Sequence, residues 1–133
     1  MSSVSCITMN MRFGLAEDGP NSWENRKRSV SALFENYAAD FICIQEANNF
    51  QTDFLNETLN DCNYIGERHP APEFWQNNII FHHHSWTCTH QEHFFLSQTP
   101  NIPSRLPGSR WPRQCTLGIF TKNDQSILFI NTH

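Results

Sequence analysis

Short apolar runs rich in β-branched and aromatic residues recur along the chain and predict a series of β-strands. The run at 4–10 alternates in its side chains, whereas the run at 39–47 is almost continuously apolar and is expected to be covered on both faces. Later runs of the same kind predict strands at 63–67, 77–82, 85–95, 114–121 and 126–133. The last two of these are expected to form a hairpin about a turn at 122–125.

Two other segments repeat apolar residues with helical spacing. The first helix has an apolar stripe at i, i+3, i+4 and i+7, formed by Val30, Leu33, Phe34 and Tyr37. Asn21 is expected to cap this helix, with Glu24 completing a capping box, and the helix is expected to end near Ala38. A second helix follows 39–47 and carries Phe50, Phe54 and Leu59 on one side. This order predicts an α/β fold, with helices on the outer face of a mixed sheet.

Composition narrows the classes of protein that fit. At 133 residues the chain is expected to form one domain, and its charged fraction of only 17% suggests large surfaces that something else covers. A net charge of −4 argues against a uniformly basic nucleic-acid binder. The five cysteines form no C-x-x-C pair and are interpreted as free thiols of a reducing compartment. Without a leader pattern or an apolar run of about 20 residues, a cytoplasmic location and no membrane segment are expected.

Polar side chains follow three of the apolar runs: Asn10, Glu46 and, at the end of the last run, His133. Ligand sites in layered α/β folds commonly lie beyond the carboxyl ends of strands. A carboxylate and an amide oxygen are ligands suited to Mg²⁺, and a histidine beside them can donate to a phosphate oxygen. Taken singly, each has a simpler explanation: Glu46 can cap the next helix, Asn10 can be a turn residue and His133 a terminal residue.

Together with their flanking sequences, these residues resemble the endonuclease/exonuclease/phosphatase superfamily of metal-dependent phosphoesterases. The motifs that carry the resemblance are, in order, TMNMRF, DGPNSWENRK, ADFICIQEA, FLSQTPNIPS, PRQCTL and FINTH. They extend over essentially the whole chain. The resemblance implies a four-layered α/β sandwich, in which two β-sheets pack face to face with helices outside, and an activity that hydrolyses a phosphodiester or phosphomonoester.

The resemblance also implies roles for individual residues. Glu46 corresponds to the direct ligand of Mg²⁺, with Mn²⁺ as the alternative ion, and Asn10 assists through its side-chain oxygen, directly or through water. Arg113 corresponds to an arginine near the substrate phosphate, and His133 to the histidine that hydrogen-bonds the scissile phosphate. Asn131 is expected to support the end of its strand. The substrate stays open among a nucleic acid, a nucleotide and a sugar or inositol phosphate.

In the family, the N-T-H motif lies about midway through the domain. The later G-D-x-N motif and the D-H pair that supplies the general base are not found here. Residues 1–133 are therefore interpreted as the N-terminal portion of a single domain, inactive alone, whose partner is the missing C-terminal half. The inner face of the first sheet is then expected to lie exposed. The alternative is a non-catalytic remnant or association module of a split or truncated hydrolase.

Three further features leave alternatives open. A histidine cluster could bind zinc, and it comprises His82, His83, His84, His90 and His93. Three tryptophans could stack on bases or belong to the core, namely Trp75, Trp86 and Trp111. The loop at 97–113 holds four of the seven prolines and either helps select the substrate or is a solvated crossover.

Overall fold

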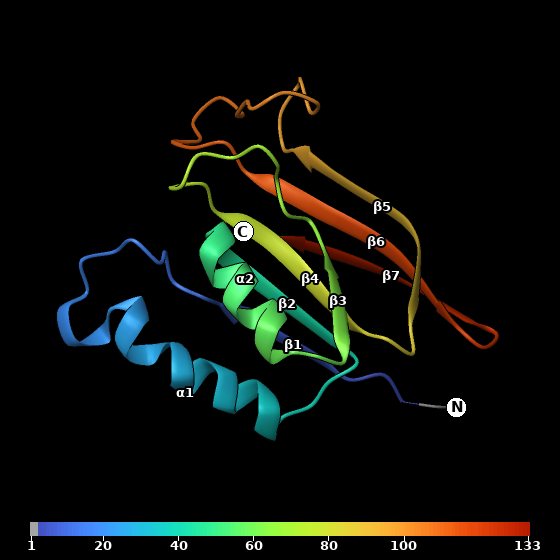
Figure 1. Cartoon of the computed structure of the whole chain (residues 1–133). Helices are drawn as coiled ribbons and strands as arrows, with labels where there is room; N and C mark the ends of the chain where they lie inside the picture. Colours follow the sequence, from blue (N-terminus) through green and yellow to red (C-terminus); the bar gives the residue numbers. More distant parts are fainter. Residues whose placement is uncertain (1–2) are drawn as a thin grey trace.

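Two β-sheets pack face to face, and both helices lie on the outer side of one of them (Figure 1). The computed structural model describes residues 3–133. Sheet A contains, in spatial order, β1 (Cys6–Asn10), β2 (Phe41–Ala47), β4 (Asn77–His83) and β3 (Cys62–Ile65). Sheet B contains β5 (Thr87–Phe95), β6 (Gln114–Lys122) and β7 (Gln125–Thr132). The helical segments are η1 (Gly19–Asn21), α1 (Trp23–Asn36) and α2 (Asn49–Thr58).

Sheet A is mixed, because β1 and β2 run parallel whereas β4 is antiparallel to both β2 and β3. The predicted α/β class, with two helices on the outer face of a mixed sheet, is confirmed. The loop between Phe95 and Gln114 contains neither helix nor strand, as its prolines predicted. Between residues 3 and 133 no helix is long and apolar enough to cross a membrane.

Strand β2 contributes to two cores because its side chains alternate between the faces of sheet A. Ile42 and Ile44 point toward the helices and pack with Phe34 of α1. Phe41 and Cys43 point toward sheet B and pack with a second group that includes Ile80, Trp86 and Phe120. The almost continuous apolar run at 39–47 therefore has the cause inferred from the sequence, namely burial on both faces.

The start of α1 differs from the prediction. Asn21 lies in η1 rather than at the helix cap, and Ser22 precedes the first helical residue without a side-chain capping bond. Pro20 fixes the backbone of this short turn, which displaces the helix start by one residue. Glu24 instead pairs with Lys27 at 2.6 Å.

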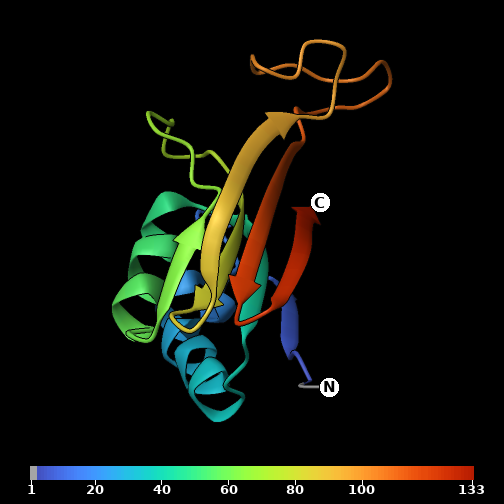
Figure 2. The ribbon, with the colours of Figure 1, turned by 90° about the vertical axis from the view of Figure 1, so that its right-hand side faces the viewer.

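The expectation that the inner face of sheet A lies exposed is wrong, because sheet B covers it. The rings of Phe41 on β2 and Phe129 on β7 stack with their centroids 4.1 Å apart. The uncovered surfaces lie elsewhere. The edge strands are β1 and β3 in sheet A and β5 and β7 in sheet B, and Figure 2 shows β1 and β7 on the same side of the molecule. The outer face of sheet B carries no helix between residues 3 and 133 and bears an apolar group made of Leu117, Ile119, Leu128 and Ile130.

All five cysteines are free thiols, as predicted. Cys43, Cys62 and Cys115 are buried, and burial raises the pKa of Cys43 and of Cys62 to about 12. Cys6 is exposed, which differs from its expected place in an apolar strand. The difference arises because its strand, β1, is an edge that no other strand covers.

Candidate active site

Three polar side chains meet at one end of the strands: Asn10, Glu46 and His133. The amide nitrogen of Asn10 lies 3.1 Å from Glu46 Oε1 and 3.3 Å from His133 Nε2. His133 Nδ1 lies 3.7 Å from the same Glu46 oxygen. Asn10 and Glu46 are neighbours because β1 and β2 are parallel and in register, with Asn10 opposite Gln45. The structure therefore brings together the three residues that the sequence placed at separate strand ends.

Glu46 reaches this position through an irregularity in β2. Its φ is 59°, and the register of β2 against β4 shifts between Ile44 and Ala47. A non-glycine residue with this φ costs of order 1 kcal/mol or more, and such conformations concentrate at functional sites. The backbone N–H of Phe13 donates to Glu46 Oε2 at 3.0 Å and holds the carboxylate in place.

The carboxylate of Glu46 is kept ionised despite being partly buried. Burial raises its pKa, but hydrogen bonds from Asn10 and Phe13 and the positive charges of protonated His133 and of Arg12 together lower it by more, so the pKa lies below its usual value. An ionised, partly exposed carboxylate is available to a cation.

Asn10 orients the other two side chains. Its Oδ1 accepts the backbone N–H of Arg12 at 2.8 Å, which fixes the amide with its nitrogen toward the site. That nitrogen only donates, so His133 Nε2 can take part in this contact only as the acceptor. The bond from Arg12 uses one of the two lone pairs of the Asn10 oxygen, which leaves the other for a second partner.

The turn after β1 was not recognised as part of the site from the sequence. Arg12 has a φ of 61° and its guanidinium binds Asp18 at 2.9 and 2.8 Å, while Arg26 donates to its carbonyl oxygen at 3.1 Å. These bonds hold the turn whose N–H groups bind Asn10 and Glu46. The DGPNSWENRK segment, which supplies Asp18 and Arg26, carried the signal.

A cavity of about 580 Å³ opens beside Glu46 and His133. Arg113 is exposed and lines this cavity, so the structure also brings the fourth predicted residue to the site. Trp111 lines it and is 58% exposed, whereas Trp86 is buried between the sheets and belongs to the core.

Buried amide side chains fix the floor of the site. Asn131 Nδ2 donates to the carbonyl oxygens of Ile44 and Ile79 at 2.9 Å each, and its Oδ1 accepts a bond of 2.8 Å from Gln45. Asn131 thus joins β7 to two strands of sheet A, and its predicted role in supporting the strand end is confirmed.

Glu46 is the carboxylate that this site offers to a cation. Mg²⁺ keeps several of its waters and takes only one or two carboxylates from a protein, so a single Glu46 with Asn10 beside it fits that ion. Zinc is usually held by three or four His, Cys, Asp or Glu side chains. Within residues 3–133 no group of three or more such side chains is placed to hold a metal ion.

The histidines weighed as zinc ligands are spread over different environments. His82 is buried and its Nδ1 lies 3.0 Å from the carbonyl oxygen of Trp86. His83 lies at the surface, 3.8 Å from Asp61, and His90 lies on β5.

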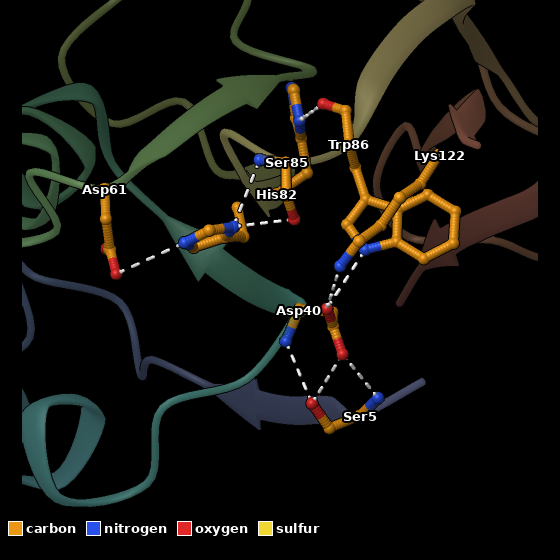
Figure 3. A network of polar contacts seen from close by, with 8 residues as sticks. Ser5, Asp40, Asp61, His82, Ser85, Trp86 and Lys122 are labelled. Atoms are coloured by element: carbon orange, nitrogen blue, oxygen red, sulfur yellow. Dashed lines mark hydrogen bonds and ion pairs between the residues drawn. The ribbon is translucent and has the colours of Figure 1, made fainter. Parts of the chain in front are cut away.

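A separate polar cluster lies at the other end of sheet A, where β1 and β2 begin (Figure 3). Asp40 accepts hydrogen bonds from the backbone N–H and hydroxyl of Ser5, both at 2.9 Å, and from Trp86 Nε1 at 3.0 Å, with Lys122 Nζ 3.8 Å away. Burial raises the pKa of Asp40, but these bonds and the Lys122 charge outweigh it, so the pKa lies below its usual value. Asp40 thereby ties β1 to the β5 and β6 ends of sheet B.

The fold and site define the chain as a layered α/β sandwich with a polar site at the carboxyl ends of its strands. The sequence pattern of the Endonuclease/Exonuclease/phosphatase family matches residues 7–123. The chain belongs to this family. No curated protein matches the chain in sequence.

Solved structures share the fold over the full chain. An endonuclease/exonuclease/phosphatase from Bacteroides vulgatus superposes with a TM-score of 0.90 at 21% identity, covering 100% of this chain and 53% of its own. A mannosyl-6-phosphatase from Bacteroides thetaiotaomicron superposes with a TM-score of 0.88 at 25% identity, and the match covers 98% of this chain and 51% of that protein. TDP2 from D. rerio, in complex with a single-stranded DNA product, superposes with a TM-score of 0.76 at 16% identity, and the match covers 100% of this chain and 46% of that protein. The chain spans about half the length of these structures.

Proposed function

We propose that this chain carries the metal- and phosphate-binding part of a divalent-metal-dependent phosphoesterase site. The observation that carries the proposal is the meeting of Asn10, Glu46 and His133 within hydrogen-bonding reach at one end of β1, β2 and β7. The family to which the chain belongs supports the same reaction class, because it comprises phosphoesterases and nucleases.

Each residue has a role in this proposal. Glu46 holds Mg²⁺, or Mn²⁺ as the alternative, with Asn10 fixing the orientation of its carboxylate. The bound ion supplies neutralisation of the phosphate charge and activation of a water for in-line attack. His133 donates a hydrogen bond to a phosphate oxygen from Nδ1, the ring nitrogen that does not contact Asn10, and Arg113 approaches the same phosphate across the cavity with its always-charged guanidinium.

The 133 residues alone are proposed to be the N-terminal portion of one domain and to be inactive. The groups named above bind the phosphate and the ion, but none of them is placed as a general base for the attacking water. Loss of a general base commonly reduces the rate by 10²–10⁴-fold. The chain's span of about half the length of the solved relatives supports this interpretation.

The substrate is proposed to be a phosphate ester, either a nucleic acid, a nucleotide or a sugar or inositol phosphate. The solved relatives include a phosphatase named for a mannosyl phosphate and a protein bound to a DNA product. These names support both sugar and nucleotide candidates.

Binding of Mn²⁺, followed by its electron paramagnetic resonance signal, tests the proposed site without needing turnover. The chain should bind the ion, and Glu46→Gln should weaken binding by at least roughly 10-fold. Glu73→Gln, which neutralises an exposed carboxylate next to the cavity-lining Phe74, is the matched control and should leave the affinity unchanged. Equal affinities of the chain and Glu46→Gln would refute the metal site.

A phosphatase assay with Mg²⁺ and nitrophenyl phosphate tests the proposed inactivity. The chain should show turnover far below that of an intact family member such as the mannosyl-6-phosphatase, assayed on the same nitrophenyl ester. Comparable rates would show that the 133 residues contain a complete catalytic apparatus.

The second candidate function is association with a complementary half-domain. It is favoured by the apolar outer face of sheet B, where Leu128 and Ile130 are 55% and 58% exposed. Helices cover the corresponding face of sheet A, so a second set of helices is the natural cover here. Co-purification with a separately expressed C-terminal half, and restored turnover of the pair, would establish this function.

A further inference from the structure

The cavity beside the candidate site has an aromatic wall, which we define as Phe74 and Trp111. Their side chains are 64% and 58% exposed, and both line the same cavity as Glu46 and His133. Two large apolar side chains that are exposed together in a cavity mark a ligand-binding surface rather than a core. The wall is built from two segments that lie 37 positions apart in the sequence.

The segment that carries Phe74 is held in a fixed position. The buried Asn48 donates to the carbonyl oxygens of Glu73 at 2.9 Å and Trp75 at 3.0 Å, on either side of Phe74. Trp75 Nε1 in turn donates to Gln114 Oε1 at 3.3 Å. Because these bonds anchor both neighbours of Phe74, this half of the wall requires little ordering when a ligand binds.

Two of the three amide side chains that line the cavity, those of Asn78 and Gln114, are already engaged within the protein, and the third, Gln76, is exposed. Asn78 Nδ2 donates to the carbonyl oxygen of Gln114 at 2.7 Å, and Gln114 Nε2 donates to the carbonyl oxygen of Gly66 at 2.7 Å. A sugar that enters such a cavity exchanges the water around its hydroxyl groups for few protein partners, which is costly. A flat aromatic ring has little polar surface on its faces and loses much less.

We propose that the aromatic wall binds a flat aromatic ring in the alcohol part of a phosphate ester, such as the base of a nucleoside monophosphate, in preference to a sugar phosphate. The proposal rests on the proposed function, because it takes the phosphate to lie at Arg113 and His133. Stacking of a base on aromatic side chains increases affinity by roughly 10-fold or more. The wall therefore selects substrates by the group attached to the phosphate, whereas Arg113 binds the phosphate itself.

Calorimetric titration of the chain with four ligands in Mg²⁺ measures the contribution of the ring. Adenosine monophosphate should bind roughly 10-fold more tightly than ribose 5-phosphate, which lacks only the base. Mannose 6-phosphate and inorganic phosphate should bind no more tightly than ribose 5-phosphate. Equal affinities of adenosine monophosphate and ribose 5-phosphate, tighter binding of mannose 6-phosphate, or no binding of any ligand would each overturn the proposal.

Variants separate this proposal from the proposed function. Phe74→Ala and Trp111→Ala should each lower the affinity for adenosine monophosphate several-fold and leave that for ribose 5-phosphate unchanged, while Arg113→Gln should weaken both alike. Leu106→Ala, an exposed position of the same loop as Trp111 but outside this cavity, is the control. If Arg113→Gln weakens both ligands but the wall variants have no effect, the ring site alone is refuted. If the wall variants act and Arg113→Gln does not, the placement of the phosphate is refuted, and the proposal with it.

Discussion

Gln45 on β2 donates a hydrogen bond of 2.8 Å to Asn131 on β7, and this contact joins the two opposing sheets beneath the candidate active site. Gln45 immediately precedes Glu46, and Asn131 lies two positions before His133. The carboxylate and the imidazole thus depend on one buried pair of amides for their relative position. A buried polar pair destabilises a protein unless its donors and acceptors are hydrogen-bonded. Both amides here have several hydrogen-bond partners, so the pair stabilises the contact between the sheets.

Replacement of this buried amide should destabilise the chain strongly. Asn131→Ala leaves the carbonyl oxygens of Ile44 and Ile79 without the amide that they bind and removes a partner of Gln45, so a loss of about 2–4 kcal/mol in unfolding free energy is expected. Urea unfolding followed by circular dichroism measures it. Asn101→Ala, at an exposed position in the long loop, should change the free energy by less than about 0.5 kcal/mol. Equal stability of the two variants would contradict a structural role for Asn131.

The elements of this fold could be predicted from the sequence because their signals are local. The continuous run of β2 reports on burial within a few positions, as do Val30 and Phe34 of α1. The other two members of the predicted stripe, Leu33 and Tyr37, are exposed. Strand ends likewise indicated Asn10, Glu46 and His133, since carboxyl ends of strands collect ligand sites.

Contacts between distant segments could not be predicted in this way. The left-handed φ of Glu46 goes with the bulge in β2 and with the Phe13 N–H that holds its carboxylate. No pattern of residues in the sequence predicts the bulge or this hydrogen bond. The aromatic wall joins Phe74 and Trp111 across two loops, which only the packed sheets bring together. The cover of sheet A by sheet B was missed for the same reason, because it depends on how the chain crosses between sheets.

Gly66 is expected to tolerate no side chain, for reasons of both conformation and space. Its φ is 100°, and an added Cβ would lie 2.6 Å from Thr116 Oγ1 and 2.7 Å from the carbonyl oxygen of Asn78. Gly108, with a φ of 85° and nothing within 4 Å, provides a matched comparison. Gly108→Ala should lose about 1 kcal/mol through backbone strain alone, and Gly66→Ala about 1–3 kcal/mol more through overpacking. Thermal unfolding of both variants measures the difference, and equal losses would contradict the steric part of the argument.

Asp40 is expected to stabilise the chain in a manner that depends on pH. Its pKa lies below the ordinary value of 3.8, so its ionised form is favoured by folding; this stability is complete above that value and is lost as the pH falls through the lower folded pKa. Asp40→Asn should therefore cost about 1–3 kcal/mol at neutral pH, and less as the pH falls below 3.8.

Urea midpoints of the chain and the Asp40→Asn variant across this pH range test the prediction. Asp124→Asn, at the exposed turn between β6 and β7, removes the same charge without the same partners and should show no comparable pH dependence. A constant difference between the chain and Asp40→Asn at all pH values would show that the charge of Asp40 is not what stabilises the cluster.

The outer face of sheet B should make the isolated chain self-associate. Leu117 pairs with Ile130 and Ile119 with Leu128 across β6 and β7, so the four side chains form one continuous apolar surface beside the free edge of β7. Size-exclusion chromatography should show oligomers, and the chain should enhance the fluorescence of a hydrophobic dye. The double variant Leu128→Thr with Ile130→Thr should reduce both signals, because threonine keeps the strand conformation while removing apolar surface.

A second double variant shows whether the location of this surface is decisive. Ile102→Thr with Leu106→Thr removes side chains that are 58% and 48% exposed, but from the loop between β5 and β6. If self-association depends on the sheet face, the loop variant behaves like the unmodified chain and only the strand variant becomes monomeric. If both variants become monomeric to the same extent, total exposed apolar area governs association. A monomeric, dye-silent unmodified chain would show that this face needs no partner, and the association function would then lose its main support.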